Sequence, residues 1–175
     1  MTLTLRPAVA ADLMAVGDLQ NRSRAVAYRD IVPADALAAE TGEMMGRYWT
    51  ERWAYERDTH LMTVAERDGR LVGFSYLGPH DPAEPDSAGP DVGELYAIHL
   101  DPAEQGRGSG RTLMVDALAK LRARGWRRAV LWVLVDNAHA RDFYARGGWV
   151  PDGAEREGGI GPVLTPQIRY ARDLP

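Results

Sequence analysis

The sequence predicts a single α/β domain in which helices cover both faces of a mixed β-sheet. Two observations support this prediction. Short β-type runs alternate along the chain with amphipathic helical segments, and 175 residues is the length of one ordinary domain. The hydrophobic fraction of 45% and the charged fraction of 26% are those of an average globular protein, so we expect a folded chain with a substantial core.

The first third of the chain is predicted to contain one strand followed by helices. Residues 3–6 alternate in hydrophobicity, and Pro7 ends this strand. Asp12 is an N-cap candidate for the next helix, and Pro33 suits the first turn of a second one. Apolar and aromatic side chains then recur every three or four positions over 44–55, which predicts a helix with an aromatic face.

The middle of the chain changes to a period of two. Residues 61–66 and 70–77 are rich in β-type residues, and Asp68-Gly69 between them is a strong hairpin signal. The segment 78–91 contains four prolines and shows no periodicity, which predicts an exposed, mobile loop.

The second half is predicted to alternate strands and helices, ending in a strand. Gly125 is placed to form a left-handed cap after the first helix of this half. We expect strands at 93–100, 129–135 and 167–172, helices from Gly108 onward and at 138–146, and a Gly/Pro-rich turn between Trp149-Val150 and the last strand.

The composition excludes several classes of function. The chain has no cysteine, so disulfides, thiol nucleophiles and thiolate metal sites are ruled out, and its four histidines lie far apart, so we expect no metal. A net charge of −4 disfavours nucleic acid as a partner, although the basic stretch 105–128 could bind a small polyanion. No apolar run reaches the length of a membrane span or signal peptide, so we expect a cytoplasmic protein.

A glycine-rich loop between a predicted strand and a predicted helix carries the clearest functional signal. Alternate glycines leave the backbone open to a ligand, and the helix that follows presents unpaired N–H groups, so a pyrophosphate fits here. The spacing matches neither the dinucleotide-binding fingerprint nor the Walker loop, which disfavours nicotinamide and ATP sites. On glycine content alone, a flexible turn remains the alternative. The loop reads Gln105-Gly106-Arg107-Gly108-Ser109-Gly110-Arg111.

Gln105-x-x-Gly108-x-Gly110 resembles the coenzyme A loop of the GNAT superfamily of N-acetyltransferases. The segment 136–149 is similar to the second signature of that family, with an Asn, a short helix containing Phe-Tyr and a closing Gly, although Trp149 stands where a Phe is usual. The resemblance implies a mostly antiparallel sheet of about six or seven strands. It also implies acetyl-CoA as co-substrate and an amine as acceptor.

The resemblance also implies roles for individual residues. Tyr144 would protonate the departing thiolate, and Asn137 would bind the pantetheine arm, which Ile98, His99 and Leu100 would contact through their backbone. The residues themselves leave simpler alternatives open, namely an aromatic packing role for Tyr144 and an N-cap role for Asn137.

The general base is predicted from strand periodicity. Glu94 is the first candidate and Tyr96 the second, because a period of two places both on one face of the strand that leads to the coenzyme. An exposed carboxylate at a strand start is an equally simple interpretation of Glu94. His99 has a suitable intrinsic pKa, but alternation places it on the opposite face.

The acceptor is expected beside the first helices and the hairpin, where Tyr28, Arg29, Trp49 and Trp53 could line a pocket with Tyr96. Each of these aromatic residues could instead belong to the core. A small-molecule amine is the favoured acceptor. A protein N-terminus or lysine, or a non-catalytic acyl-CoA sensor, remains an alternative, and the sequence leaves open whether a homodimer completes the acceptor site.

Overall fold

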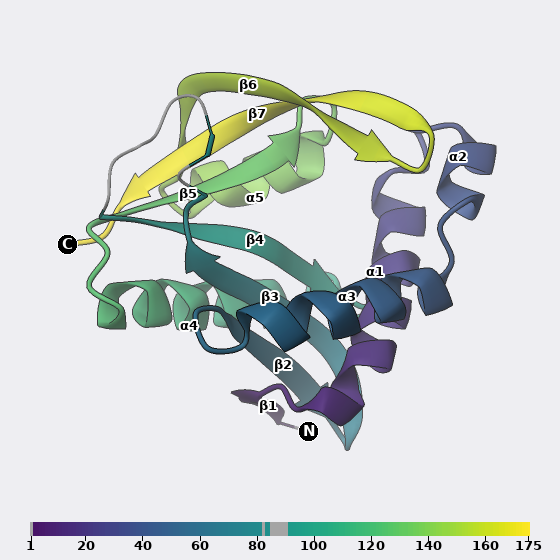
Figure 1. Ribbon diagram of the computed structural model, residues 1–175, viewed down its shortest axis with the longest axis horizontal. Coiled ribbons are helices and arrows are strands. Elements are labelled where there is room, and N and C mark those ends of the chain that lie inside the picture. Colours follow the sequence, from purple (N-terminus) through teal and green to yellow (C-terminus); the bar gives the residue numbers. More distant parts are fainter. Residues whose placement is uncertain (1, 82, 85–90) are drawn as a thin grey trace.

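A computed structural model describes residues 2–81, 83–84 and 91–175. In these residues seven strands form one sheet in the order β1-β2-β3-β4-β5-β7-β6, which agrees with the predicted class and strand number (Figure 1). The elements are β1 Leu3–Pro7, a 3₁₀ turn Ala10–Asp12, α1 Leu13–Ala27, α2 Ala34–Ala38, α3 Gly42–Glu56, β2 Leu61–Arg67, β3 Arg70–Pro79, β4 Val92–Leu100, a 3₁₀ turn Pro102–Glu104, α4 Ser109–Ala123, β5 Arg128–Leu134, α5 Ala138–Arg146, β6 Val150–Ile160 and β7 Val163–Asp173.

Neighbouring strands in this sheet are antiparallel except for β4 and β5, which pair in parallel. The predicted hairpin between β2 and β3 is confirmed: Asp68 and Gly69 both have positive φ, 54° and 73°, as a two-residue type I′ turn requires. The parallel pair joins an N-terminal half of the sheet, β1–β4, to a C-terminal half, β5–β7–β6.

Helices α1 and α3 cover one face of the N-terminal half, over a core that includes Trp49 and Phe74. The two helices touch through their backbones, since a Cβ on Gly17 would lie 2.1 Å from the backbone nitrogen of Gly46. This contact explains why glycines stand inside α3, which begins before the predicted position at the Thr41 cap. Asp12 does not cap α1, because its carboxylate accepts from Arg6 and from the backbone N–H of Val9.

Helices α4 and α5 cover the other face. The apolar stripe of α4 packs on β3, β4 and β5 in a core that contains Leu95 and Leu131, and Phe143 and Tyr144 of α5 pack against its edge. The predicted left-handed cap after α4 is confirmed by Gly125, with φ of 86°. The bounds predicted for α5, 138–146, are those observed.

The long hairpin β6–β7 is the main departure from the predicted elements. Most of the segment expected to be a Gly/Pro-rich turn is strand, and only residues 161–162 form the connection. Pro151 and Gly153 are tolerated because β6 is an edge strand with an irregular register between Pro151 and Glu155. The tip of the hairpin packs Ile160 against Val32 and Ala36, at the corner formed with α2.

The segment 78–91 is only partly the exposed loop that was predicted. Gly78 and Pro79 extend β3, and His80 is 7% exposed because it packs beside Glu94. Residues 82 and 85–90 of that prediction lie outside the described residues. No helix in the described part of the chain has both the length and the apolar character needed to cross a membrane.

Candidate functional site

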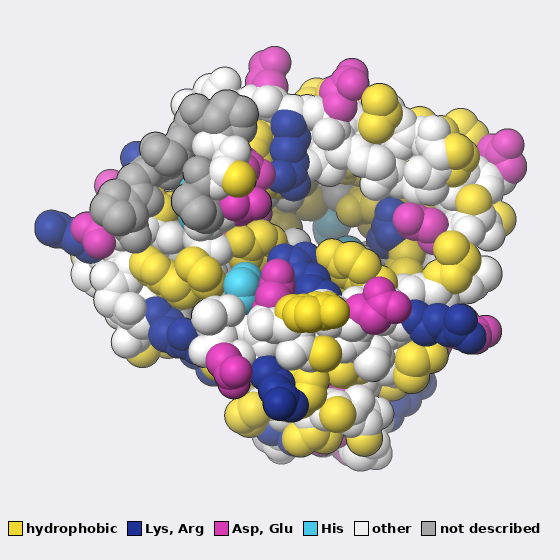
Figure 2. Space-filling view, in the orientation of Figure 1, with side chains coloured by type: hydrophobic (Ala, Val, Ile, Leu, Met, Phe, Trp, Pro, Cys, Tyr) yellow, Lys and Arg dark blue, Asp and Glu magenta, His cyan; other side chains and the backbone are white. Residues whose placement is uncertain are grey.

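A cavity opens in the sheet where β4 and β5 separate. Val92–Glu94 of β4 pair with Arg128–Val130 of β5, and beyond these residues the two strands do not pair with each other in the part of the chain that the structure describes. The cavity has a volume of about 240 Å³ and is lined by β4 from Leu95 to Leu100 and by β5 from Trp132 to Leu134, with α1 and α5 on either side. Figure 2 shows a hollow at the centre of the molecule, bordered by hydrophobic and charged side chains.

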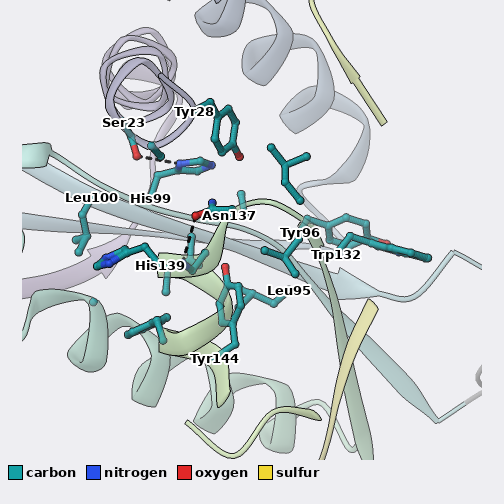
Figure 3. Close-up of a pocket in the computed structure, with 18 of the residues that line it drawn as sticks. Ser23, Tyr28, Leu95, Tyr96, His99, Leu100, Trp132, Asn137, His139 and Tyr144 are labelled. Atoms are coloured by element: carbon teal, nitrogen blue, oxygen red, sulfur yellow. Dashed lines mark hydrogen bonds between the residues drawn. The ribbon is translucent and has the colours of Figure 1, made fainter. Parts of the chain in front are cut away.

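Nine of the predicted site residues line this cavity, whereas six predicted catalytic or coenzyme-binding residues do not, and neither do Arg29, Trp49 and Trp53 of the predicted acceptor pocket. In Figure 3, Leu100 and His139 mark one end of the cavity and Tyr96 and Trp132 the other. The lining includes Tyr28, Tyr96, Ile98, His99, Leu100, Gln105, Gly110, Asn137 and Tyr144, whereas Glu94, Gly106, Arg107, Gly108, Ser109 and Arg111 lie outside it.

The glycine loop has the open backbone that was predicted. Gly106 and Gly108 have φ of 76° and 81°, in the left-handed region, and a Cβ built on either would meet no atom within 4 Å. Gly108 is the residue before the first turn of α4, so the free N–H groups of that turn face the same open space. Arg107 and Arg111 are exposed beside it. The geometry therefore suits an anion bound by backbone donors and flanking cations.

Glu104 anchors this loop through a buried hydrogen bond from Ser109. The sequence analysis overlooked this residue. It is 4% exposed, and its carboxylate accepts from Arg67 Nη2 at 3.0 Å and from Ser109 Oγ at 2.8 Å. The hydrogen bonds from Arg67 lower the pKa of Glu104. The buried Ser109 hydroxyl therefore takes part in a hydrogen bond within the protein. The only sequence signal was a carboxylate within a loop expected to bind an anion.

Asn137 has the N-cap role that the residues alone suggested. Its Oδ1 accepts from the backbone N–H of Ala140 at 3.2 Å, which fixes the start of α5. Because this bond uses the carbonyl oxygen, the amide nitrogen remains available on the cavity side (Figure 3). The capping role and the predicted role in ligand binding are thus compatible.

Two tyrosine hydroxyls enter the cavity from opposite sides. Tyr144 of α5 and Tyr28, just after α1, both point their oxygen atoms into the space between them (Figure 3). Burial raises the pKa of both hydroxyls, and Tyr28 adds to the rise at Tyr144. Both groups therefore stay protonated at neutral pH and are suited to donating a proton or a hydrogen bond.

A bulge in β4 corrects the predicted alternation. Tyr76 pairs with Ala97 and Leu77 with Leu95, so Tyr96 is an extra residue on β4. The shift brings His99 to the face that carries Tyr96, where its ring stacks on Phe74. Glu94 is on this face too, since its partner Gly78 lies against His60, which packs on Tyr96. The prediction that His99 faces away from Glu94 is therefore wrong.

The three candidate bases have different surroundings. Burial lowers the pKa of His99 to about 4, helped by Arg24, and Ser23 Oγ lies 3.1 Å from its Nδ1. The hydroxyl of Tyr96 donates to the carbonyl of Pro79 at 2.5 Å, and burial followed by the charge of Glu94 raises its pKa. The simpler interpretation of Glu94 as exposed is wrong, because it is 3% exposed.

The predicted acceptor pocket forms only in part. Of its aromatic residues, Tyr28 and Tyr96 line the cavity, whereas Trp49 is a core residue that donates to Gln20 at 2.6 Å. Trp53 packs against the same core, and Arg29 borders a separate depression beside α2. The error arose because helix periodicity identifies the buried face of α3 without revealing what that face covers.

Trp132 of β5 is an aromatic residue of the cavity that the sequence analysis did not identify. Its side chain lines the main cavity and a second one of about 410 Å³, which also includes Glu84 and Arg156. Arg156 lies over the Trp132 ring at 4.2 Å from the centroid and pairs with Glu84 at 2.8 Å. No sequence signal distinguished this tryptophan, which stands in a continuous apolar run.

Comparisons with known proteins agree with this geometry. The acetyltransferase (GNAT) family matches residues 27–149. Mycothiol acetyltransferase of Cellulomonas flavigena is 39% identical over 105 residues, covering 59% of this chain and 30% of that protein, and the Beutenbergia cavernae protein of the same name is 45% identical over 93 residues, covering 53% and 29%. The chain thus spans less than a third of the length of these relatives.

Solved structures share the fold over the whole chain. PaiA N-acetyltransferase from Thermoplasma acidophilum, in complex with coenzyme A, superposes with a TM-score of 0.79 at 17% identity, covering 99% of both chains. Ribosomal-protein-alanine N-acetyltransferase from Brucella melitensis superposes with a TM-score of 0.72 at 24% identity, covering 98% of this chain and 99% of its own.

Proposed function

The chain belongs to the acetyltransferase (GNAT) family, and from this premise we propose that it transfers the acetyl group of acetyl-CoA to a primary amine of a small molecule. The observation that carries the proposal is the cavity between β4 and β5, which has an anion cradle near one end and two protonated tyrosines inside it. Mycothiol acetyltransferase relatives favour a small-molecule acceptor over a protein.

The residues present fit a coenzyme A thioester. The left-handed glycines and the first turn of α4 would bind the pyrophosphate, and the unpaired edge of β4 from Leu95 onward offers backbone groups to the amides of the pantetheine arm. Asn137 contributes an amide nitrogen from the opposite wall. Acetyl-CoA would supply an acetyl group already activated as a thioester.

The side chains divide the proton transfers between them. An acceptor ammonium gives one proton through water to Glu94 and then attacks the thioester carbonyl as a neutral amine. As the carbon–sulfur bond breaks, Tyr144 donates its hydroxyl proton to the departing thiolate, and the nitrogen loses its second proton to restore the tyrosine. The products are the amide, the free thiol and one proton released to solvent.

The test of this proposal is calorimetric titration with acetyl-CoA, followed by thiol release against a panel of amines and peptides. Tyr144→Phe should bind acetyl-CoA normally and lower kcat about 100-fold, since positioned proton donors contribute on that order. Tyr170→Phe is the matched control, because its ring centroid lies 6.2 Å from that of Tyr144 while its hydroxyl accepts from Arg141 at 3.2 Å.

Each other outcome selects a different function. Thiol release with peptides alone would replace the small molecule by a protein acceptor. Tight binding of acetyl-CoA without release on any acceptor would indicate an acyl-CoA sensor. Failure to bind acetyl-CoA at all would refute the proposal.

A further inference from the structure

His80 and Glu94 form a buried pair beside the point where β4 and β5 separate. The side chains are 2% and 4% exposed, and His80 Nδ1 lies 2.9 Å from Glu94 Oε2. Apolar residues of similar size usually stabilise a protein at least as well as a buried ionisable pair, so stability alone does not account for the pair. The pair lies next to the cavity, so we consider a functional role for it.

The pair lies between the two cavities. Glu94 is the last residue of β4 that pairs with β5, opposite Val130, and Leu95 and Tyr96 immediately after it line the main cavity. The charged groups that act on Glu94 from other elements include Glu84 and Arg156, and these two residues line the second cavity. Glu94 thus precedes two residues of the main cavity and interacts electrostatically with two residues of the second one.

The groups around Glu94 shift its pKa in opposite directions. Burial raises the pKa of Glu94, with a smaller contribution from the charge of Glu84, while the hydrogen bond and charge of His80 act in the other direction, together with Arg156. On the same strand, the charge of Glu94 contributes to the raised pKa of Tyr96. A base works best when its pKa lies near the working pH, so the balance between burial and His80 decides whether Glu94 is ionised when an acceptor arrives.

The imidazole has one side-chain hydrogen bond among the described residues, the one with Glu94. An ionised carboxylate only accepts hydrogen bonds, so whenever Glu94 is ionised, Nδ1 of His80 carries the proton of this contact and donates it to Glu94. Nε2 of His80 is buried and has no hydrogen-bond partner in the described part of the chain. The hydrogen bond to Glu94 thus orients the ring, and no other hydrogen bond from a described residue competes for it.

We propose that His80 is a positioning residue that acts through Glu94, keeping this carboxylate ionised and aimed at the cavity so that it can take a proton from the acceptor's ammonium group. This inference rests on the function proposed above. The ammonium N–H bond breaks, the proton passes through water to Glu94, and the N–H electron pair remains on the amine that attacks. The proton returns to solvent after the products leave.

The experiment is the pH profile of kcat/KM for His80→Phe and His80→Asn, in the full chain with acetyl-CoA and the best amine of the panel. Without His80 the pKa of Glu94 rises, so the carboxylate is protonated up to a higher pH. The acid limb of the kcat/KM profile should therefore move up by about one pH unit in His80→Phe. Asn places an amide donor near the position of Nδ1, so His80→Asn should move the limb less. The Kd for acetyl-CoA should stay within about twofold.

A purely structural role predicts a different result. Loss of packing would lower kcat/KM at every pH without moving the limb, and this outcome would overturn the proposal. His60→Asn is the matched control. The side chain of His60 is also buried, at 9% exposed, but its polar neighbours are Thr59 and Glu56 and not Glu94. Its acid limb should coincide with that of the wild type.

A second readout does not depend on turnover. Carbon-13 NMR of glutamate-labelled protein, with Glu94→Gln to assign the signal, follows the Glu94 carboxyl directly in the unliganded chain. Its midpoint should rise in His80→Phe, or in His80→Asn if the Phe variant does not fold, and an unchanged midpoint would overturn the proposal. Turnover with an unmoved limb refutes this inference alone, whereas no turnover with any acceptor refutes the proposed function and this inference with it.

Discussion

The two ends of the cavity are built in different ways. The end predicted to bind coenzyme A consists of one loop and the start of one helix, within the seven residues Gln105–Arg111. The end predicted to receive the acceptor is assembled from side chains of α1, β4, β5 and β7. The first end relies on backbone geometry that glycines specify locally, and the second depends on how distant strands pair. Substitutions at the two ends should therefore affect different parameters.

The largest expected effect comes from a single methyl group at the coenzyme end. In Gly108→Ala the new Cβ would enter the space that we assign to the pyrophosphate, so the Kd for acetyl-CoA should rise about 100-fold, equivalent to about 2.7 kcal/mol. Titration calorimetry measures this directly. Gly69→Ala is a matched control, because Gly69 also has positive φ, 73° against 81°, and the same open surroundings.

Both glycine variants should lose about 1–2 kcal/mol of unfolding free energy, the cost of a left-handed residue with a side chain. Only Gly108→Ala should lose affinity. Equal loss of acetyl-CoA binding in the two variants would mean that the effect arises from general destabilisation and that the loop does not hold the pyrophosphate.

An intermediate effect is expected at the acceptor end. Trp132→Leu removes the ring shared by the two cavities and should raise the KM for the acceptor about tenfold, equivalent to about 1.4 kcal/mol, with the Kd for acetyl-CoA unchanged. Initial rates at varied acceptor and acetyl-CoA concentrations separate the two constants. Trp126→Leu is the control, since Trp126 is a partly buried tryptophan that packs on the α4 side of the sheet.

A rise in the acetyl-CoA Kd of Trp132→Leu equal to the rise in acceptor KM would contradict the separation of the two ends. It would show that the β5 side chains support both ligands together.

The smallest effect concerns stability at the coenzyme end. Glu104→Gln should lose about 1 kcal/mol of unfolding free energy at pH 7, because a neutral amide replaces charge-assisted hydrogen bonds by weaker neutral ones. Arg67 lowers the folded-state pKa of Glu104, so the stabilisation is fully present above its ordinary value of 4.5 and is lost as pH falls through the lowered value. Urea unfolding of both proteins between pH 7 and pH 3 measures it.

The difference in unfolding free energy between wild type and Glu104→Gln should shrink toward pH 3. A constant difference across this range would mean that the carboxylate charge contributes nothing and that only the shape of the side chain matters.

The same contrast explains how much could be predicted from sequence. The β2–β3 hairpin, the bounds of α5 and the open backbone of the glycine loop follow from neighbouring residues and were predicted correctly. The bulge at Tyr96 and the pair of His80 with Glu94 arise from register between strands, which residue alternation alone does not encode. The hairpin β6–β7 was underpredicted because proline and glycine usually signal turns, whereas an edge strand accepts them.

The backbone contact between Gly17 and Gly46 has a consequence for how this cavity can change. Because α1 and α3 meet backbone to backbone at Gly17 and Gly46, the two helices are in direct contact there, and Ser23 of α1 and Tyr28 just beyond it line the cavity from this side. A larger residue at either glycine would push the helices apart and move both cavity residues together. Exchange of individual cavity side chains would, in contrast, change the cavity without altering this contact between the helices.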